Sequence, residues 1–125
     1  MKLRSIFLFT VLTVLALYAC KKSSDSSSQA VDYGALASGT YTGTVQLLKS
    51  GAEVVISKQS TTAVNIDFTI TGGSPRHYTD VVAGDGGGGK ILLSLTTGPT
   101  PINGTVNGKS LDCYFDQVHF TGTKP

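Results

Sequence analysis

Cys113 and His119 are residues of the types that form an activated nucleophile in enzymes, because a thiolate beside an imidazole is such a nucleophile. The residues between them alternate as in two strands joined by a turn at Asp116-Gln117. In that hairpin Tyr114 lies opposite His119. Cys113 lies opposite Phe120, so the thiol points into a core and the imidazole points to solvent. We therefore predict a buried structural cysteine and not a catalytic pair.

A glycine-rich run from Gly84 to Lys90 has the spacing of a phosphate-binding loop up to its lysine. The next residue is Ile91, whereas a phosphate-binding loop needs Ser or Thr there to hold magnesium. Such a loop also needs a helix after it, and the residues that follow resemble a strand. We therefore interpret the run as a flexible hairpin tip.

The densest cluster of polar and aromatic residues follows the turn from Gly72 to Pro75. Arg and Tyr are frequent anchors of interfaces, so Arg76, His77 and Tyr78 form a candidate binding rim. A solvated edge strand would carry the same residue types. Both interpretations remain open at this point.

The rest of the chain offers no recognisable set of catalytic or metal-ligating residues. The two histidines lack the Cys-His spacing of a zinc site. The eight acidic residues are scattered, so they indicate no carboxylate pair of the kind that hydrolyses glycosides. We therefore expect no metal, no cofactor and no enzymatic activity.

The first residues have the layout of an export signal. Lys2 and Arg4 precede an apolar run from Ile6 to Leu17, and a small Ala19 stands directly before Cys20. The run is shorter than the roughly 20 apolar residues that a transmembrane helix needs, and the chain turns polar after it. We predict a signal peptide over residues 1–19, removed before Cys20.

The residues Leu17-Tyr18-Ala19-Cys20 resemble the lipobox of bacterial lipoproteins, in which the cysteine becomes the acylated first residue of the mature protein. This resemblance implies that Cys20 carries lipid and anchors the chain to a membrane. Residues 20–32, which are polar and rich in Ser, would then form a tether. Each buried acyl methylene adds about 0.8 kcal/mol, so two or more acyl chains hold a protein firmly. An ordinary signal peptide followed by an incidental cysteine is the alternative.

The composition indicates one packed domain with little net charge. The chain has 125 residues, of which 40% are hydrophobic and 14% charged. Without Lys2 and Arg4 of the signal, the ten basic residues become eight and balance the eight acidic ones. This balance argues against a disordered chain and against a nucleic-acid partner. Cys113 is then the only other cysteine, so we expect no disulfide within the domain.

From Gly39 onward the chain reads as short strands separated by turn residues. Apolar and polar residues alternate strictly over residues 64–70, and similar runs cover residues 40–49, 53–59, 76–83, 91–97, 101–107, 110–115 and 117–123. Asn107-Gly108 is the strongest hairpin signal. This pattern predicts an all-β barrel or sandwich of about eight strands. The side chains expected to fill its interior are Tyr41, Leu47, Ile66, Phe68, Leu93, Leu111, Phe115 and Phe120.

Three segments together resemble the small calycin-like, or lipocalin-like, β-barrel lipoproteins of Bacteroidetes. They are Gly39-Thr40-Tyr41-Thr42-Gly43-Thr44, the Asn-Gly hairpin, and Val118 to Lys124. The resemblance covers residues 39–125, and Tyr41 stands where the first strand of lipocalins carries a Trp. It implies an antiparallel up-and-down barrel of about eight strands over residues 33–125, with no unpaired edge.

These features predict a lipid-anchored protein of the bacterial cell envelope, at the outer membrane, with a non-catalytic binding role. Its ligand would be a small hydrophobic molecule at the barrel mouth or an envelope protein on the rim. A protein-interaction role such as protease inhibition is the alternative. A carrier of small ligands needs an open interior, so the packing of the barrel discriminates between these roles.

Overall fold

The computed structural model describes residues 30–125, and the predictions for the signal peptide and for Cys20 fall outside these residues. Asp32–Pro125 form one compact unit. It contains a short helix and eight strands: α2 (Tyr33–Ala37), β1 (Gly39–Val45), β2 (Ser50–Ser60), β3 (Ala63–Ile70), β4 (Arg76–Gly87), β5 (Lys90–Leu95), β6 (Ile102–Asn107), β7 (Ser110–Phe115) and β8 (Val118–Thr123). Within the described residues, no helix has the length and the apolar character that crossing a membrane requires.

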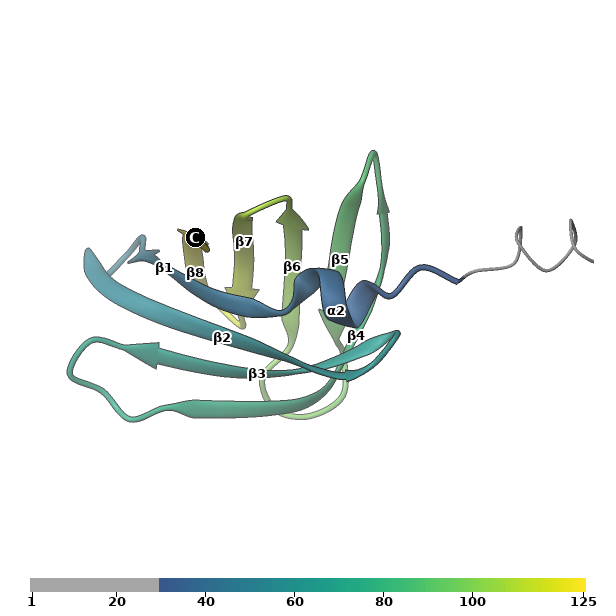
Figure 1. Ribbon diagram of the computed structural model, residues 1–125. Helices are drawn as coiled ribbons and strands as arrows, with labels where there is room; N and C mark the ends of the chain where they lie inside the picture. Colours follow the sequence, from purple (N-terminus) through teal and green to yellow (C-terminus); the bar gives the residue numbers. More distant parts are fainter. Residues whose placement is uncertain (1–29) are drawn as a thin grey trace, which may run out of the picture. The chain divides into compact units, whose positions relative to one another are not determined.

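The eight strands form a closed up-and-down barrel, which confirms the predicted fold class (Figure 1). Each strand pairs antiparallel with the next along the chain, and β8 pairs with β1. The turns 46–49, 71–75, 96–101 and 116–117 lie at one end of the barrel, which we call the loop end. The helix α2, the C-terminus and the other three turns lie at the opposite end, which we call the helix end.

Apolar side chains fill the interior of the barrel. Phe68 stacks on Phe115 with 4.4 Å between the ring centroids, and Phe120 meets Phe68 edge-on at 6.2 Å. Aromatic pairs of this kind add about 0.5 to 1.5 kcal/mol beyond the area that they bury. Seven of the eight side chains predicted for the interior are buried: Tyr41, Ile66, Phe68, Leu93, Leu111, Phe115 and Phe120.

The prediction for Leu47 is wrong. The strand β1 ends at Val45, and Leu47 lies in the turn 46–49 with 83% of its surface exposed. Lys49, with a φ of 47°, has left-handed backbone that a continuing strand cannot contain. Ser50 and Gly51 then open β2.

The glycine-rich run lies at the tip of the β4–β5 hairpin, as predicted, but most of the run is strand and not loop. The strand β4 continues through Gly87, and only Gly88 and Gly89 connect it to β5. Both have positive φ, 61° and 79°, which glycine adopts without steric cost. Lys90 then opens β5, so the helix that must follow a phosphate-binding loop is missing here.

The helix α2, which was not predicted, covers the helix end of the barrel (Figure 1). The buried Tyr41 hydroxyl donates to the carbonyl of Ala37 at 2.8 Å, and burial raises the pKa of Tyr41 to about 12. Lys124 Nζ lies 5.3 Å from the centroid of the Tyr41 ring and donates to the carbonyls of Leu36 and Ser38. A lysine here satisfies carbonyls that have no partner within the helix. The first and last parts of the domain are therefore joined at this end.

Candidate functional site

The first part of β4 is a free strand edge in the wall of the barrel. It pairs with β3 from Arg76 onward, but its pairing with β5 begins only at Val82, opposite Ser94. Four residues of segment 76–81 therefore pair with β3 alone, and Thr79 and Asp80 have no partner on either strand. In an antiparallel strand the backbone N–H and C=O groups point alternately to the two sides, so half of those groups in this segment point away from β3. The expectation of a barrel with no unpaired edge is therefore wrong for residues 76–81, and the edge strand considered from the sequence is present there.

A β-bulge at Asp80 separates the free edge from the rest of β4. The register against β3 shifts between Val64 and Ile66, and Asp80 has a φ of 59°. Gln59 holds Asp80 through two hydrogen bonds: its Nε2 donates to the side-chain Oδ1 of Asp80 at 2.6 Å, and its Oε1 accepts from the backbone amide of Asp80 at 3.1 Å. A bulge bends the strand that contains it. Because β4 bends here, its first part follows β3 and leaves β5.

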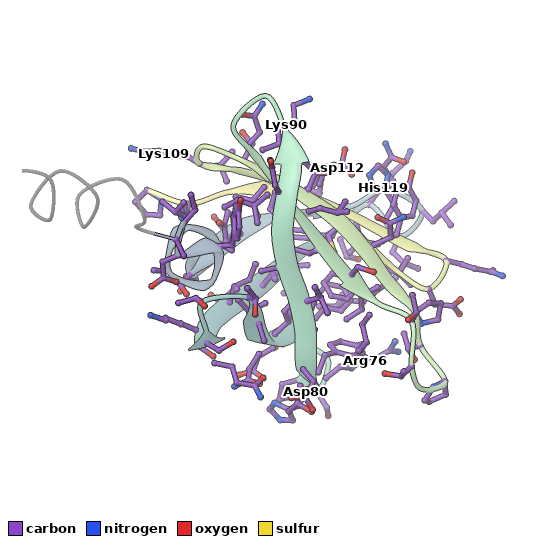
Figure 2. All side chains as sticks on the ribbon, turned by 90° about the vertical axis from the view of Figure 1, so that its right-hand side faces the viewer. Arg76, Asp80, Lys90, Lys109, Asp112 and His119 are labelled. Atoms are coloured by element: carbon purple, nitrogen blue, oxygen red, sulfur yellow. The ribbon has the colours of Figure 1, made fainter. Side chains whose placement is uncertain are left out.

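A hollow of about 520 Å³ lies beside this edge, a size within the range of ligand sites. Its lining comes from β4 and from the end of β5 with the following turn: Arg76, His77, Tyr78, Thr79, Asp80, Leu95, Thr97, Gly98, Pro99 and Thr100. Figure 2 shows Arg76 in the lower part of the domain, away from Lys90 and Lys109 at its top. The hollow thus separates the free edge from the β5–β6 turn.

The structure brings the three predicted rim residues together on this edge but gives them different surroundings. Arg76 and His77 are exposed, and His77 Nδ1 lies 2.6 Å from Asp67 Oδ1 on β3. Tyr78 is half-buried and stacks on Phe115 with 5.5 Å between the ring centroids. Arg76 and His77 are therefore available to a ligand, whereas Tyr78 closes the interior beneath them.

Cys113 and His119 lie on opposite faces of the wall, as the predicted hairpin register requires. Tyr114 is opposite His119, and Cys113 is opposite Phe120. The Cys113 side chain is fully buried, and burial, with a smaller contribution from the Asp112 carboxylate, raises the pKa of its thiol to about 12. The thiolate is the nucleophilic form, so this cysteine is inert at neutral pH.

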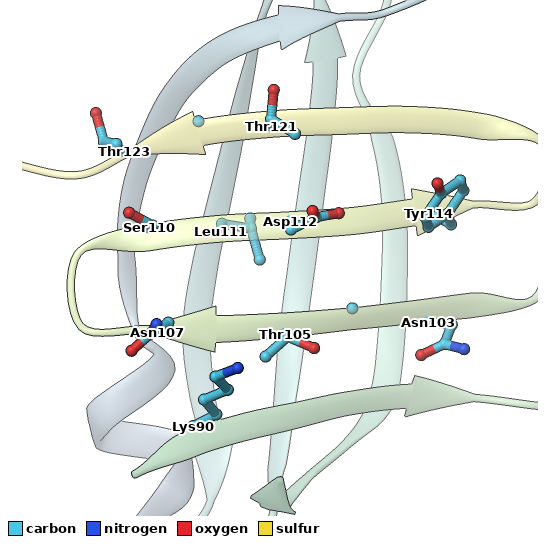
Figure 3. Close-up of a pocket in the computed structure, with 12 residues that line it drawn as sticks. Lys90, Asn103, Thr105, Asn107, Ser110, Leu111, Asp112, Tyr114, Thr121 and Thr123 are labelled. Carbon is cyan, nitrogen blue, oxygen red and sulfur yellow. The ribbon is translucent and has the colours of Figure 1, made fainter. Parts of the chain in front are cut away.

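A second hollow, of about 810 Å³, lies on the outer face of β6, β7 and β8 and was not predicted (Figure 3). Its lining is mostly short polar side chains and glycine: Lys90, Asn103, Gly104, Thr105, Asn107, Ser110, Leu111, Asp112, Tyr114, Thr121, Gly122 and Thr123. The sequence does contain one signal for this hollow: Asn103 and Asp112 lie inside strands, where Asn and Asp are unfavourable.

His119 organises one margin of this hollow. Its Nε2 lies 2.7 Å from Asp112 Oδ1, and its Nδ1 lies 2.9 Å from Gln46 Oε1. Its ring lies parallel to that of Tyr114, with 4.2 Å between the centroids. Figure 2 shows Asp112 and His119 on the same side of the domain. The imidazole is therefore held on three sides, and it in turn orients the Asp112 carboxylate.

Comparison with models of known protein families, with curated protein sequences and with solved structures finds no match for this chain. The fold defines its class: a small all-β protein with a closed, eight-stranded antiparallel barrel that is compatible with the calycin-like fold. Among residues 30–125, no three His, Cys, Asp or Glu side chains are placed to hold a metal ion.

Proposed function

We propose that this chain is a lipid-anchored protein of the bacterial envelope that is held at the outer membrane through Cys20. Its role is non-catalytic binding of another envelope protein at the loop end of the barrel. An extended segment of the partner adds to the free edge of β4. Arg76 and His77 contact the partner beside that edge.

The free edge at residues 76–81 is the observation that carries this proposal. Unpaired backbone donors and acceptors at a strand edge are satisfied when another chain adds a strand. The adjoining hollow of about 520 Å³ gives room for the side chains of such a segment. Because the bulge at Asp80 is held by two hydrogen bonds to Gln59, the edge is formed before the partner arrives. A preformed edge lowers the entropic cost of binding.

The filled interior favours a partner on the outside over a small ligand inside. Phe68, Phe115 and Phe120 are fully buried, and the Phe68 ring contacts each of the other two. Tyr78 covers Phe115 from the loop end. A small hydrophobic ligand at the barrel mouth would have to displace these rings, and displacing a packed aromatic cluster costs several kcal/mol.

The position of the edge also suits an anchored protein. The described chain enters the barrel through α2 at the helix end, and the rim lies toward the loop end. The Ser-rich composition of residues 20–29 predicts a reach on the order of 17 Å. The loop end is opposite to the end at which the described chain enters, so a partner there does not compete with α2. Leu47 and Leu48, both exposed at the loop end, add apolar contact area there.

Photo-crosslinking in cells that make the protein tests this proposal. A benzoylphenylalanine probe replaces Thr79 on the free edge, and the matched control replaces Thr61, an exposed threonine in the turn at the helix end. We expect the probe at position 79 to capture one envelope protein, with a lower yield after Arg76→Glu, and the probe at position 61 to capture none. Equal yields at the two positions, or no capture at position 79, would contradict the proposal.

A further inference from the structure

We propose that the outer face of β6, β7 and β8 is a binding site for a neutral saccharide. The site is the hollow of about 810 Å³ that Asn103, Asp112 and Tyr114 line with their neighbours (Figure 3). It shares no lining residue with the hollow beside the β4 edge. The inference therefore stands apart from the proposed partner at the loop end.

Two glycines explain why the wall is hollowed at this place. A Cβ on Gly104 would lie 2.7 Å from Cys113 Sγ, and a Cβ on Gly122 would lie 2.5 Å from a ring carbon of Phe120. Real Cβ atoms do not come so close to their neighbours, so β6 and β8 lie nearer to the core here than side chains would permit. Both glycines contribute to the floor of the hollow.

The walls of the hollow present polar groups that are ready to bind a ligand. Among the described residues, the side chains lining it make one side-chain hydrogen bond, between Asp112 and His119. The remaining hydroxyl and amide groups face solvent on Asn103, Thr105, Asn107, Ser110, Thr121 and Thr123. Hydroxyl and carboxamide groups both donate and accept, as sugar hydroxyls do. A saccharide therefore matches this lining better than an apolar molecule does.

Asp112 and Asn103 are the residues that argue most strongly for a ligand. Both lie inside strands, where their residue types are unfavourable and Thr or Val would stabilise the sheet more. His119 fixes the Asp112 carboxylate through Oδ1, which leaves Oδ2 to accept from a ligand. Hydrogen bonds to a carboxylate are stronger than those between neutral groups. Asp112 lies opposite Thr105 on β6, and Asn103 lies opposite Tyr114, so the carboxylate and the carboxamide can bind hydroxyls at separate points along a sugar chain.

The exposed tyrosine, the length and the charge of the hollow indicate which class of saccharide it would bind. Tyr114, 47% exposed, presents aromatic surface beside Asn103, on which the C–H face of a sugar ring can pack. From Asn103 to Asn107 the strand extends about 14 Å at 3.4 Å per residue, enough for a short oligosaccharide. Lys90 and Asp112 are the charged residues of the lining and have opposite sign, so the hollow favours a neutral ligand over an anionic polymer.

NMR shift mapping on nitrogen-labelled residues 21–125, which keep the whole barrel, tests the inference. The probes are cellohexaose, maltohexaose and chitohexaose, each added to millimolar concentration. We expect at least one of them to shift the side-chain amide of Asn103 and the backbone amides of β6 to β8. Asp112→Ala should weaken this binding about tenfold, as expected for losing a charged hydrogen bond. Glu53→Ala, which removes an exposed carboxylate on β2, should leave it unchanged.

Each other outcome overturns the inference. These outcomes are no shift with any of the three sugars, shifts confined to residues 76–81, and equal loss of binding in Asp112→Ala and Glu53→Ala. A polar peptide that shifts the same face when no sugar does also overturns it. If Asp112→Ala does not fold, Asn103→Ala makes the same test. Arg76→Glu should lower the crosslink yield at the loop end and leave sugar binding intact, so failure of either proposal is seen separately.

Discussion

Replacing Tyr41 with Phe removes one oxygen atom from the closed end of the barrel. The Tyr41 hydroxyl donates to the carbonyl of Ala37 at 2.8 Å, and both residues are fully buried. Phe fills the same space, so the change leaves packing intact and deprives a buried carbonyl of its donor. An unsatisfied buried polar group costs about 1 to 3 kcal/mol. We expect Tyr41→Phe to lower the free energy of unfolding by that amount.

Thermal and urea denaturation of residues 21–125, followed by circular dichroism, measure this loss. In a domain of this size about 1 kcal/mol shifts the midpoint of thermal unfolding by about 4 to 8 °C. The matched control is Tyr114→Phe, because the Tyr114 hydroxyl is in none of the hydrogen bonds among the described residues and its side chain is half exposed. We expect the control to change stability by less than about 0.5 kcal/mol.

Equal stability of the two variants would refute the role given to the helix end. Lys124→Met provides a second test of this role. Lys124 lies over the Tyr41 ring and donates hydrogen bonds to the carbonyls of Leu36 and Ser38. Substitutions at residues that contact each other usually have effects on stability that do not add. We therefore expect the double variant to lose less stability than the sum of the single losses. Strict additivity would show that the two residues do not hold α2 together.

Three further predictions concern the wall of the barrel. Cys113 should react with a thiol reagent at neutral pH only after denaturant unfolds the chain, and rapid labelling of the native protein would contradict its burial. Burial raises the pKa of Cys113 from 9.0, and that of Tyr41 from 10.0, to about 12, so the unfolded chain loses these protons first. The contribution of these two groups to the free energy of unfolding should therefore be full below about pH 9 and fall toward pH 12. Urea titrations at a series of pH values measure it, and a free energy of unfolding that does not change over this range would contradict the prediction. Gly104→Ala should cost about 1 to 3 kcal/mol because its Cβ would meet Cys113 Sγ, and adding Cys113→Ala should recover part of that loss in the same denaturation assay.

The strands and the last hairpin could be predicted because their signals are local. The two-residue alternation in 110–115 and 118–123 assigns each side chain a face, and the short turn sets the register. Tyr114 opposite His119 follows from these two facts alone. The same logic failed at Leu47, because alternation continues in the sequence through residues 46–49, where the backbone turns after the end of β1.

The helix α2 could not be predicted because its stability is tertiary. Five residues are too short to show helical periodicity and too short to be stable alone. Its partners are Tyr41 and, at the far end of the chain, Lys124. The sequence around these two residues contains no pattern that predicts their contact with a helix.

Both candidate sites depend on contacts between distant residues. The bulge that frees the edge of β4 is held by Gln59, 21 residues from Asp80. His119, which orients Asp112, is itself held by Gln46, 73 residues away. Residue types and alternation placed Arg76 and His77 on a strand and Asp112 outward, but neither pattern contains these pairings. Only the closed barrel brings them together.

The proposed function requires that the chain is lipid-anchored and that its filled barrel binds partners on its outer surface. Native mass spectrometry of the protein extracted from membranes tests both parts of this claim at once. The predicted mass is that of residues 20–125 with acyl groups on Cys20 and no small molecule retained. A retained apolar ligand that leaves only on unfolding, or a mature N-terminus without acyl groups, would contradict it.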